Sequence, residues 1–143
     1  MDCYKHTQMT GWAIIGPVGA AIIATFYFWF AQGYLVSLII GLLLLIVLFL
    51  FISLNVVVDD QSIRTWFGPG LIRKRILLSK VKSVQPVRNK WYYGWGVRYI
   101  PGGMMYNVGG LDAVELVFDN GGKFRIGTDE PQQLSDAINQ RLH

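Results

Sequence analysis

The sequence lacks charge over its longest apolar stretch and contains little cysteine. The chain has 143 residues, and its segment from Trp12 to Ile52 contains no Asp, Glu, Lys, Arg or His. The single cysteine, Cys3, excludes an intramolecular disulfide, and no Asn-x-Ser/Thr site for N-glycosylation occurs. These absences are compatible with a domain in a reducing cytoplasm.

The sequence also lacks the residue patterns of a catalytic site. Its two histidines, His6 and His143, lie near the two ends of the chain. A serine or cysteine nucleophile needs a base held beside it, and a metal site needs several converging ligands, of which Cys3 and His6 supply two. The glycines do not form a phosphate-binding loop, because no Gly-Lys-Ser/Thr follows them. We therefore expect no enzyme, no cofactor and no metal.

Two apolar blocks of nineteen residues, at 12–30 and 34–52, are the most prominent feature that is present. A helix rises about 1.5 Å per residue and the hydrocarbon core of a bilayer is about 30 Å thick, so each block can just span it. The short connection predicts an antiparallel transmembrane hairpin over residues 12–53. Because neither block contains an ionisable residue, a transporter or channel is not expected.

Small residues recur at steps of four in both blocks. They are Gly16, Ala20 and Ala24 in the first block, and Ser37 and Gly41 in the second. Small residues on one stripe let two helix backbones approach closely within lipid. We therefore predict that the hairpin packs through these five positions.

Basic residues are concentrated after the apolar blocks. Residues 1–53 carry Lys5 as their one basic residue, and the other twelve Lys and Arg follow. The net charge of +4 is better explained by the positive-inside rule than by nucleic acid, which is not an expected partner. The rule places residues 1–11 and 54–143 in the cytoplasm, as in a two-pass protein of the bacterial inner (plasma) membrane.

Residues 1–11 are short and polar, and we predict a cytoplasmic tail with no fold of its own. Cys3 would then lie close to the membrane, where acylation is the alternative to an unmodified thiol. A cleaved signal peptide is the alternative to a first span. The first block exceeds the usual signal core of about 7–15 residues, and a second apolar block follows at once.

After residue 53 the apolar residues recur with a period of two. This alternation predicts short antiparallel strands, and Asn120-Gly121 predicts a tight hairpin turn. Leu134, Ile138 and Leu142 repeat at steps of four, which predicts an amphipathic helix to the C-terminus. The predicted strands lie at 54–58, 63–67, 72–78, 79–87, 97–100, 104–108, 113–118 and 123–127.

Three segments carry a resemblance to a known family: NVVVDDQSIRTWFGPGLIRKRILLSKVKSV, VELVFDNGGKFRIGTDEP and QQLSDAINQRL. Together they resemble a small bacterial pleckstrin-homology-like (PH-like) domain, of the kind often found after a pair of membrane spans. The resemblance covers residues 54–142 and implies a small antiparallel β-barrel or sandwich capped by a C-terminal helix. The expected fold is thus membrane-anchored α+β. The bacterial-type domains share no ligand motif, so no site residue is transferred from them.

Two groups of basic residues are candidate contact surfaces. Basic side chains near an anionic leaflet gain about 1 kcal/mol each, and Trp and Tyr favour the interfacial depth. The first group is Arg73, Lys74 and Arg75; the second is Arg88 and Lys90 with the adjoining Trp91, Tyr92, Tyr93 and Trp95.

These features lead to three interpretations. The first is a non-enzymatic membrane protein that presents a cytoplasmic interaction module to a protein partner or to its own copies. The second is a sensor of anionic lipid head groups that uses both basic groups. The third is an enzyme with unrecognised chemistry, which the lack of an acid, base and nucleophile constellation disfavours. For the basic and aromatic residues alone, the alternative to lipid contact is that the charges only follow the topology and the aromatic side chains pack inside the domain or against a partner.

Overall fold

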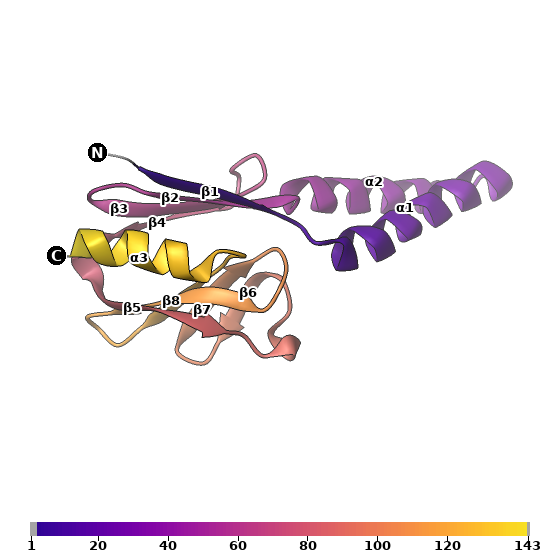
Figure 1. Ribbon diagram of the computed structural model, residues 1–143. Helices are drawn as coiled ribbons and strands as arrows, with labels where there is room; N and C mark the ends of the chain where they lie inside the picture. Colours follow the sequence, from indigo (N-terminus) through magenta and orange to yellow (C-terminus); the bar gives the residue numbers. More distant parts are fainter. Residues whose placement is uncertain (1–2, 143) are drawn as a thin grey trace.

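The computed structural model describes residues 3–142, which form an α+β fold of two β-sheets and three α-helices (Figure 1). The first sheet is an antiparallel meander in the order β1-β2-β3-β4. Its strands are β1 (Tyr4–Met9), β2 (Ser53–Val58), β3 (Ser62–Phe67) and β4 (Arg73–Leu77). Leu54, Val56 and Val58 of β2 are buried, as the predicted alternation requires.

A helical hairpin is inserted between the paired strands β1 and β2. It consists of α1 (Trp12–Gln32) and α2 (Leu35–Leu50), which pack against each other and project from one end of the domain (Figure 1). Gly33 between them adopts a positive φ of 68°, which glycine tolerates best. Among the described helices, only α1 is long and apolar enough to cross a membrane; α2 is a shorter apolar helix of 16 residues.

The sequence led us to expect an N-terminal tail with no fold of its own, and this prediction is wrong. It forms β1, whose six residues pair in register with β2, from Tyr4 opposite Val58 to Met9 opposite Ser53. At the base of the hairpin, the Thr10 N–H donates to the carbonyl of Ile52 (2.9 Å) and its hydroxyl to that of Phe51 (2.5 Å). The two ends of the hairpin are thus tied together where it meets the sheet.

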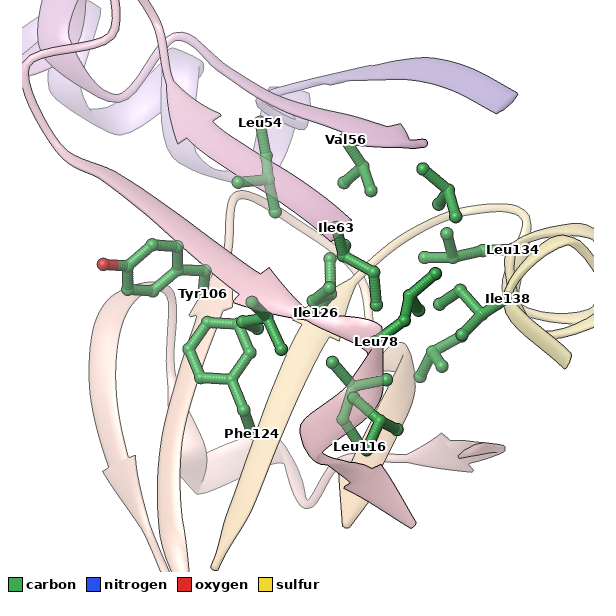
Figure 2. Close-up of a cluster of buried hydrophobic side chains, with 14 of the residues drawn as sticks. Leu54, Val56, Ile63, Leu78, Tyr106, Leu116, Phe124, Ile126, Leu134 and Ile138 are labelled. Carbon is green, nitrogen blue, oxygen red and sulfur yellow. The ribbon is translucent and has the colours of Figure 1, made fainter. Parts of the chain in front are cut away.

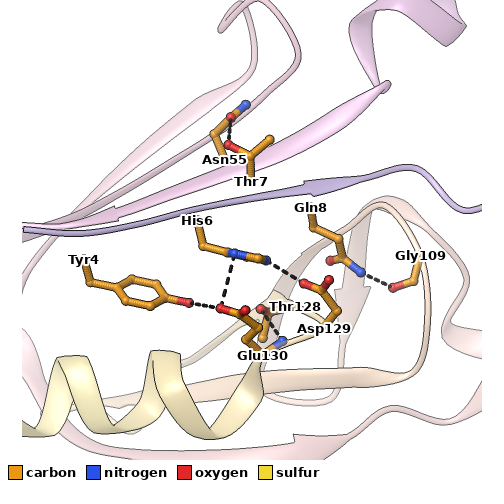
Figure 3. Close-up of polar contacts among 9 residues, drawn as sticks. All are labelled: Tyr4, His6, Thr7, Gln8, Asn55, Gly109, Thr128, Asp129 and Glu130. Atoms are coloured by element: carbon orange, nitrogen blue, oxygen red, sulfur yellow. Dashed lines mark hydrogen bonds and ion pairs between the residues drawn. The ribbon is translucent and has the colours of Figure 1, made fainter.

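Polar side chains fix the inner face of β1 (Figure 3). His6 contacts Asp129 (Nε2–Oδ1 2.6 Å) and Glu130 (Nδ1–Oε2 3.3 Å), and the Tyr4 hydroxyl donates to Glu130 (3.3 Å). Burial, with the nearby Glu130 carboxylate, raises the pKa of Tyr4. Thr7 points to the opposite face, where its hydroxyl donates to Asn55 (2.7 Å). The strand therefore belongs to the domain.

The second sheet has the order β5-β8-β9-β7-β6. All its pairs are antiparallel except β7 with β9, which are parallel. Gly121 supplies the positive φ (83°) of the predicted β8–β9 turn. The strands are β5 (Val81–Arg88), β6 (Gly96–Ile100), β7 (Gly103–Asn107), β8 (Asp112–Phe118) and β9 (Lys123–Gly127).

One hydrophobic core lies between the two sheets and the C-terminal helix α3 (Pro131–Leu142) (Figure 2). Leu134 and Ile138 of α3 are fully buried, as their spacing predicted. The helix packs on β5, β8 and the 3₁₀ turn at Leu78–Lys80. In the described part of the chain the two sheets remain separate and do not close into a barrel.

The hairpin packs differently from the small-residue prediction. Gly41 is buried on the contact face, where an added Cβ would lie 2.7 Å from Thr25 Oγ1. In α1, however, Gly16, Ala20 and Ala24 are exposed, and Ile22 is the buried residue. The prediction is therefore right for Gly41 but wrong for the stripe of α1, whose three small residues are exposed, while Ser37 is half-buried.

Candidate membrane-facing site

Three turns of the domain surround the base of the hairpin, and we call this region the hairpin end. An added Cβ at Gly68, in the β3–β4 turn, would lie 2.7 Å from the Leu50 carbonyl oxygen. One at Gly96 would lie 3.9 Å from the Phe51 ring, and one at Gly109 would lie 3.3 Å from the Gly11 nitrogen. Residues far apart in sequence thus meet at one end of the domain.

The connection from β5 into β6 reaches this end, and we call residues 88–99 the aromatic–basic segment. It contains a 3₁₀ turn, Trp91–Tyr93, which lies at the end of the domain from which the helices project (salmon in Figure 1). The side chains of Trp91, Tyr92 and Trp95 are 80%, 58% and 41% exposed. These three side chains are not packed in the core, so packing inside the domain does not explain them.

Three contacts hold the aromatic–basic segment on the second sheet. The Asn89 N–H donates to the Leu111 carbonyl (2.6 Å), and its side-chain oxygen accepts from Arg125 Nη1 (2.9 Å). The Arg125 guanidinium also lies 5.8 Å from the centre of the Tyr93 ring, within cation–π range. Arg125 therefore positions the segment while Trp91 and Tyr92 stay outside.

Arg125 is itself held by Glu115 of β8. Its Nε donates to Glu115 Oε2 (2.8 Å), and Glu115, which is 2% exposed, also contacts Lys123 (3.5 Å) and Gln85 (3.3 Å). Burial alone would raise the pKa of Glu115, but the hydrogen bond and charge of Arg125 outweigh it and hold the pKa below its ordinary value of 4.5. The carboxylate is thus a charged anchor under the segment.

This pair predicts a loss of stability at acidic pH. Because the folded pKa of Glu115 is depressed, its contribution is fully present above the ordinary value and is lost as the pH falls through the lower folded value. We expect the free energy of unfolding, measured with urea at a series of pH values, to fall below about pH 4.5. Glu115→Gln should flatten this fall. An unchanged pH dependence in that variant would contradict the role of Glu115.

A cavity of about 380 Å³ lies between the hairpin and the second sheet. Its walls come from α1, α2, Phe51 and the strands β6 and β7, and they are mainly apolar. Two polar residues in the lining are already engaged, since Thr10 donates to Phe51 and Asn107 bonds to residues 109 and 110. Ile14, Val18, Leu44, Val47, Leu48, Trp95, Gly96, Val97, Arg98 and Val108 complete the lining.

Arg98 is the one charged residue in this lining. Its Nε donates to the Trp95 carbonyl (2.8 Å), which fixes the guanidinium beside the cavity. Among residues 3–142, no carboxylate forms an ion pair with Arg98. The sequence interpretation did not include Arg98 in either basic group, although it follows Arg88 and Lys90 in the same acid-free stretch.

The first basic group is placed differently from the second. Arg73, Lys74 and Arg75 lie on β4, an edge strand of the first sheet, whereas Arg88 and Lys90 belong to the second. Lys74 points inward, with its Nζ 4.4 Å from the centre of the Phe124 ring, while Arg73 and Arg75 are exposed. Basic residues on an edge strand discourage pairing with other chains. The edge position of this group is thus compatible with a role that needs no ligand.

Cys3 lies at the opposite end of β1 from the hairpin. Its thiol donates to Asp59 (3.0 Å), and that hydrogen bond raises the pKa of the thiol. The six residues of β1 therefore separate Cys3 from the base of α1. No group of three or more potential metal ligands occurs within residues 3–142.

No protein-family model matches the chain, and no curated protein sequence matches it either.

Proposed function

We propose that the chain is a non-enzymatic, two-pass protein of the bacterial inner membrane whose PH-like domain rests on the cytoplasmic leaflet. In this proposal the aromatic–basic segment contacts anionic lipid head groups. The observation that carries it is the exposure of Trp91, Tyr92 and Trp95 at the hairpin end.

Insertion of the hairpin is supported by its exposed apolar side chains. Leaving such a side chain in water forgoes about 1.5–3 kcal/mol of burial free energy, and those of α1 and α2 together would forgo tens of kcal/mol. Trp12 at the base and Trp29 near the tip, both exposed, are separated by about 25 Å of helix. Aromatic side chains at two such levels suit the two interfaces of a bilayer.

Two passes follow from strand pairing if α1 crosses. Because β1 and β2 are neighbours in one sheet, the start of α1 and the end of α2 lie together. If α1 crosses the bilayer, α2 must therefore cross back. Helix α2 is about 24 Å long, which calls for slight thinning of the bilayer or anchoring by Tyr34 and Phe51. Cleavage after α1 would remove β1 from the sheet, which argues against a signal sequence.

The links between the hairpin and the sheet are short. Two residues join Met9 to Trp12, and two join Leu50 to Ser53. With the ends also tied through Thr10, the domain has little freedom to swing relative to the helices. An inserted hairpin would thus hold the aromatic–basic segment at the level of the head groups. The excess of Lys and Arg on this side of the spans favours the cytoplasmic leaflet.

The PH-like assignment rests on the order of the elements. A four-stranded meander, the antiparallel set β5-β8-β9 and a closing C-terminal helix follow the plan expected for that family. In this proposal the helical hairpin replaces the first turn of the meander, and the β6–β7 hairpin is an addition at the edge of the second sheet.

A second function, association with a partner's helix or with a second copy, is favoured by the outward stripe of α1. Gly16, Ala20 and Ala24 face away from α2 and leave a narrow surface on which another helix can pack closely. Such an assembly is compatible with lipid contact by the domain, because the two surfaces lie on different parts of the chain.

Fluorescence quenching tests the lipid contact. In a full-length chain whose other four tryptophans are replaced by phenylalanine, Trp91 should be quenched by brominated acyl chains in phosphatidylglycerol nanodiscs. The matched control keeps Gln140→Trp as its only tryptophan. Gln140 is exposed in the last turn of α3. The neighbouring Arg141 contacts Asp60 (3.8 Å) in the β2–β3 turn, far from the hairpin. If the brominated lipids quench Trp91 no more than they quench the tryptophan at position 140, the proposal is overturned.

A further inference from the structure

The cavity at the base of the hairpin adjoins the aromatic–basic segment, but the proposed surface contact does not account for it. Its size decides between two kinds of occupant. A helix is about 10 Å or more across, so about 380 Å³ would hold roughly one turn of it. The same volume lies within the range of about 300–1,000 Å³ found for small-molecule sites. The cavity therefore suits a single flexible chain or a small ligand better than a segment of another protein.

The lining indicates an apolar ligand with one negative charge at its end. Ile14, Val18 and Leu48 from the two helices face Val97 and Val108 from the domain, so the cavity bridges both parts. Arg98 is the one charged residue of the lining, and it is held there by its bond to Trp95. No acidic residue contributes to the lining. An apolar wall with a single fixed cation is complementary to a phospholipid, in which an apolar acyl chain is joined through glycerol to an anionic phosphate.

We propose that the cavity binds one anionic phospholipid of the surrounding leaflet, with an acyl chain along the hairpin and the phosphate on Arg98. The inference rests on the proposed insertion, which places the base of α1 where head groups meet acyl chains. Arg98 Nε is engaged by Trp95, and its two terminal nitrogens supply the donors for the phosphate. The bound lipid would join the hairpin to the domain as a structural ligand.

Native mass spectrometry of the full-length protein in neutral detergent tests this site. Phosphatidylglycerol and phosphatidylcholine with identical acyl chains are added in equal amounts. We expect one phosphatidylglycerol per chain, retained about tenfold better than phosphatidylcholine, because both lipids offer Arg98 a phosphate but only phosphatidylcholine adds a choline cation that repels the guanidinium. Arg98→Gln should abolish this preference, and Leu48→Trp, which fills the cavity, should reduce retention of both lipids. Val18→Phe is a milder filling variant, in case Leu48→Trp fails to fold.

Arg88→Gln is the matched control, since Arg88 is an exposed cation of the same segment outside the cavity. It should keep the single retained lipid. Equal retention of phosphatidylglycerol by the wild type and Arg98→Gln, or a lipid-free dimer as the main species, would overturn the inference. If Trp91 is quenched but no lipid is retained, this site fails alone. If Trp91 is not quenched, the proposed surface contact fails independently of this result.

Discussion

Replacing Arg125 with methionine should lower the free energy of unfolding by about 3–5 kcal/mol, the range for breaking a buried ion pair by removing one partner. Glu115 would remain almost fully buried with its charge opposed only by Lys123 at 3.5 Å, in a side chain that is partly exposed. Asn89 and Tyr93 would lose their contacts with Arg125 in the same variant. Urea unfolding in detergent, followed by circular dichroism, measures the change.

The same variant should loosen the aromatic–basic segment. Trypsin under native conditions should cut after Arg88 or Lys90 faster than in the wild type, because only the Asn89 N–H bond to Leu111 would remain of the three contacts that hold the segment. Arg64→Met is the matched control. Arg64 also pairs with a carboxylate (Asp59, 2.9 Å), but its side chain is half exposed, so we expect at most about 1 kcal/mol. Equal, small losses in both variants would show that the Glu115–Arg125 pair does not anchor the segment.

Most of the domain could be predicted from sequence because its strands alternate clearly. Leu54, Val56 and Val58 are the most buried residues of β2 and recur with a period of two, although Val57 between them is also buried, and Asn120-Gly121 marks the β8–β9 turn. The stripe of Leu134 and Ile138 likewise placed α3. In these elements the side chains that contact the core lie close together in sequence, so their local pattern carries the information.

Strand β1 could not be predicted because its inner face is polar. Tyr4, His6 and Gln8 do not read as a buried face, and they are satisfied by Glu130, Asp129 and the Gly109 carbonyl, all more than a hundred residues away. Apolar alternation, the usual signal of a strand, is therefore missing. Only the folded domain supplies the partners that make this sequence a strand.

The site was predicted in part. The composition of residues 88–95 pointed to an unusual surface, and the exposure of Trp91 agrees with that, but Arg98 and the cavity were missed. The cavity lining runs from Thr10 to Val108, so no local pattern could mark it. The stripe of α1 was misassigned because spacing alone does not show which face meets α2. At that contact, the buried Gly41 of α2 leaves room for the side chains of Thr25 and Phe26 of α1.

The helical hairpin is inserted between two paired strands, so that the N-terminal strand and the domain share one sheet. Cross-linking in native membranes tests it. Thr7 and Asn55 are direct partners on the face of the first sheet away from His6 and Glu130, and partners in an antiparallel ladder have Cα atoms about 4.5–5.5 Å apart, which suits a disulfide. The variant pairs Thr7→Cys with Asn55→Cys and replaces Cys3 with serine.

The control pairs Met9→Cys with Val57→Cys on the same face. Met9 lies opposite Ser53, so these two thiols are four residues out of register, or about 13 Å apart. After mild oxidation of membranes that contain the full-length chain, digestion and mass spectrometry identify the cross-linked peptides. We predict near-complete linkage of residues 7 and 55 and almost none of 9 and 57. An unlinked 7–55 pair, or equal linkage of both pairs, would contradict the account.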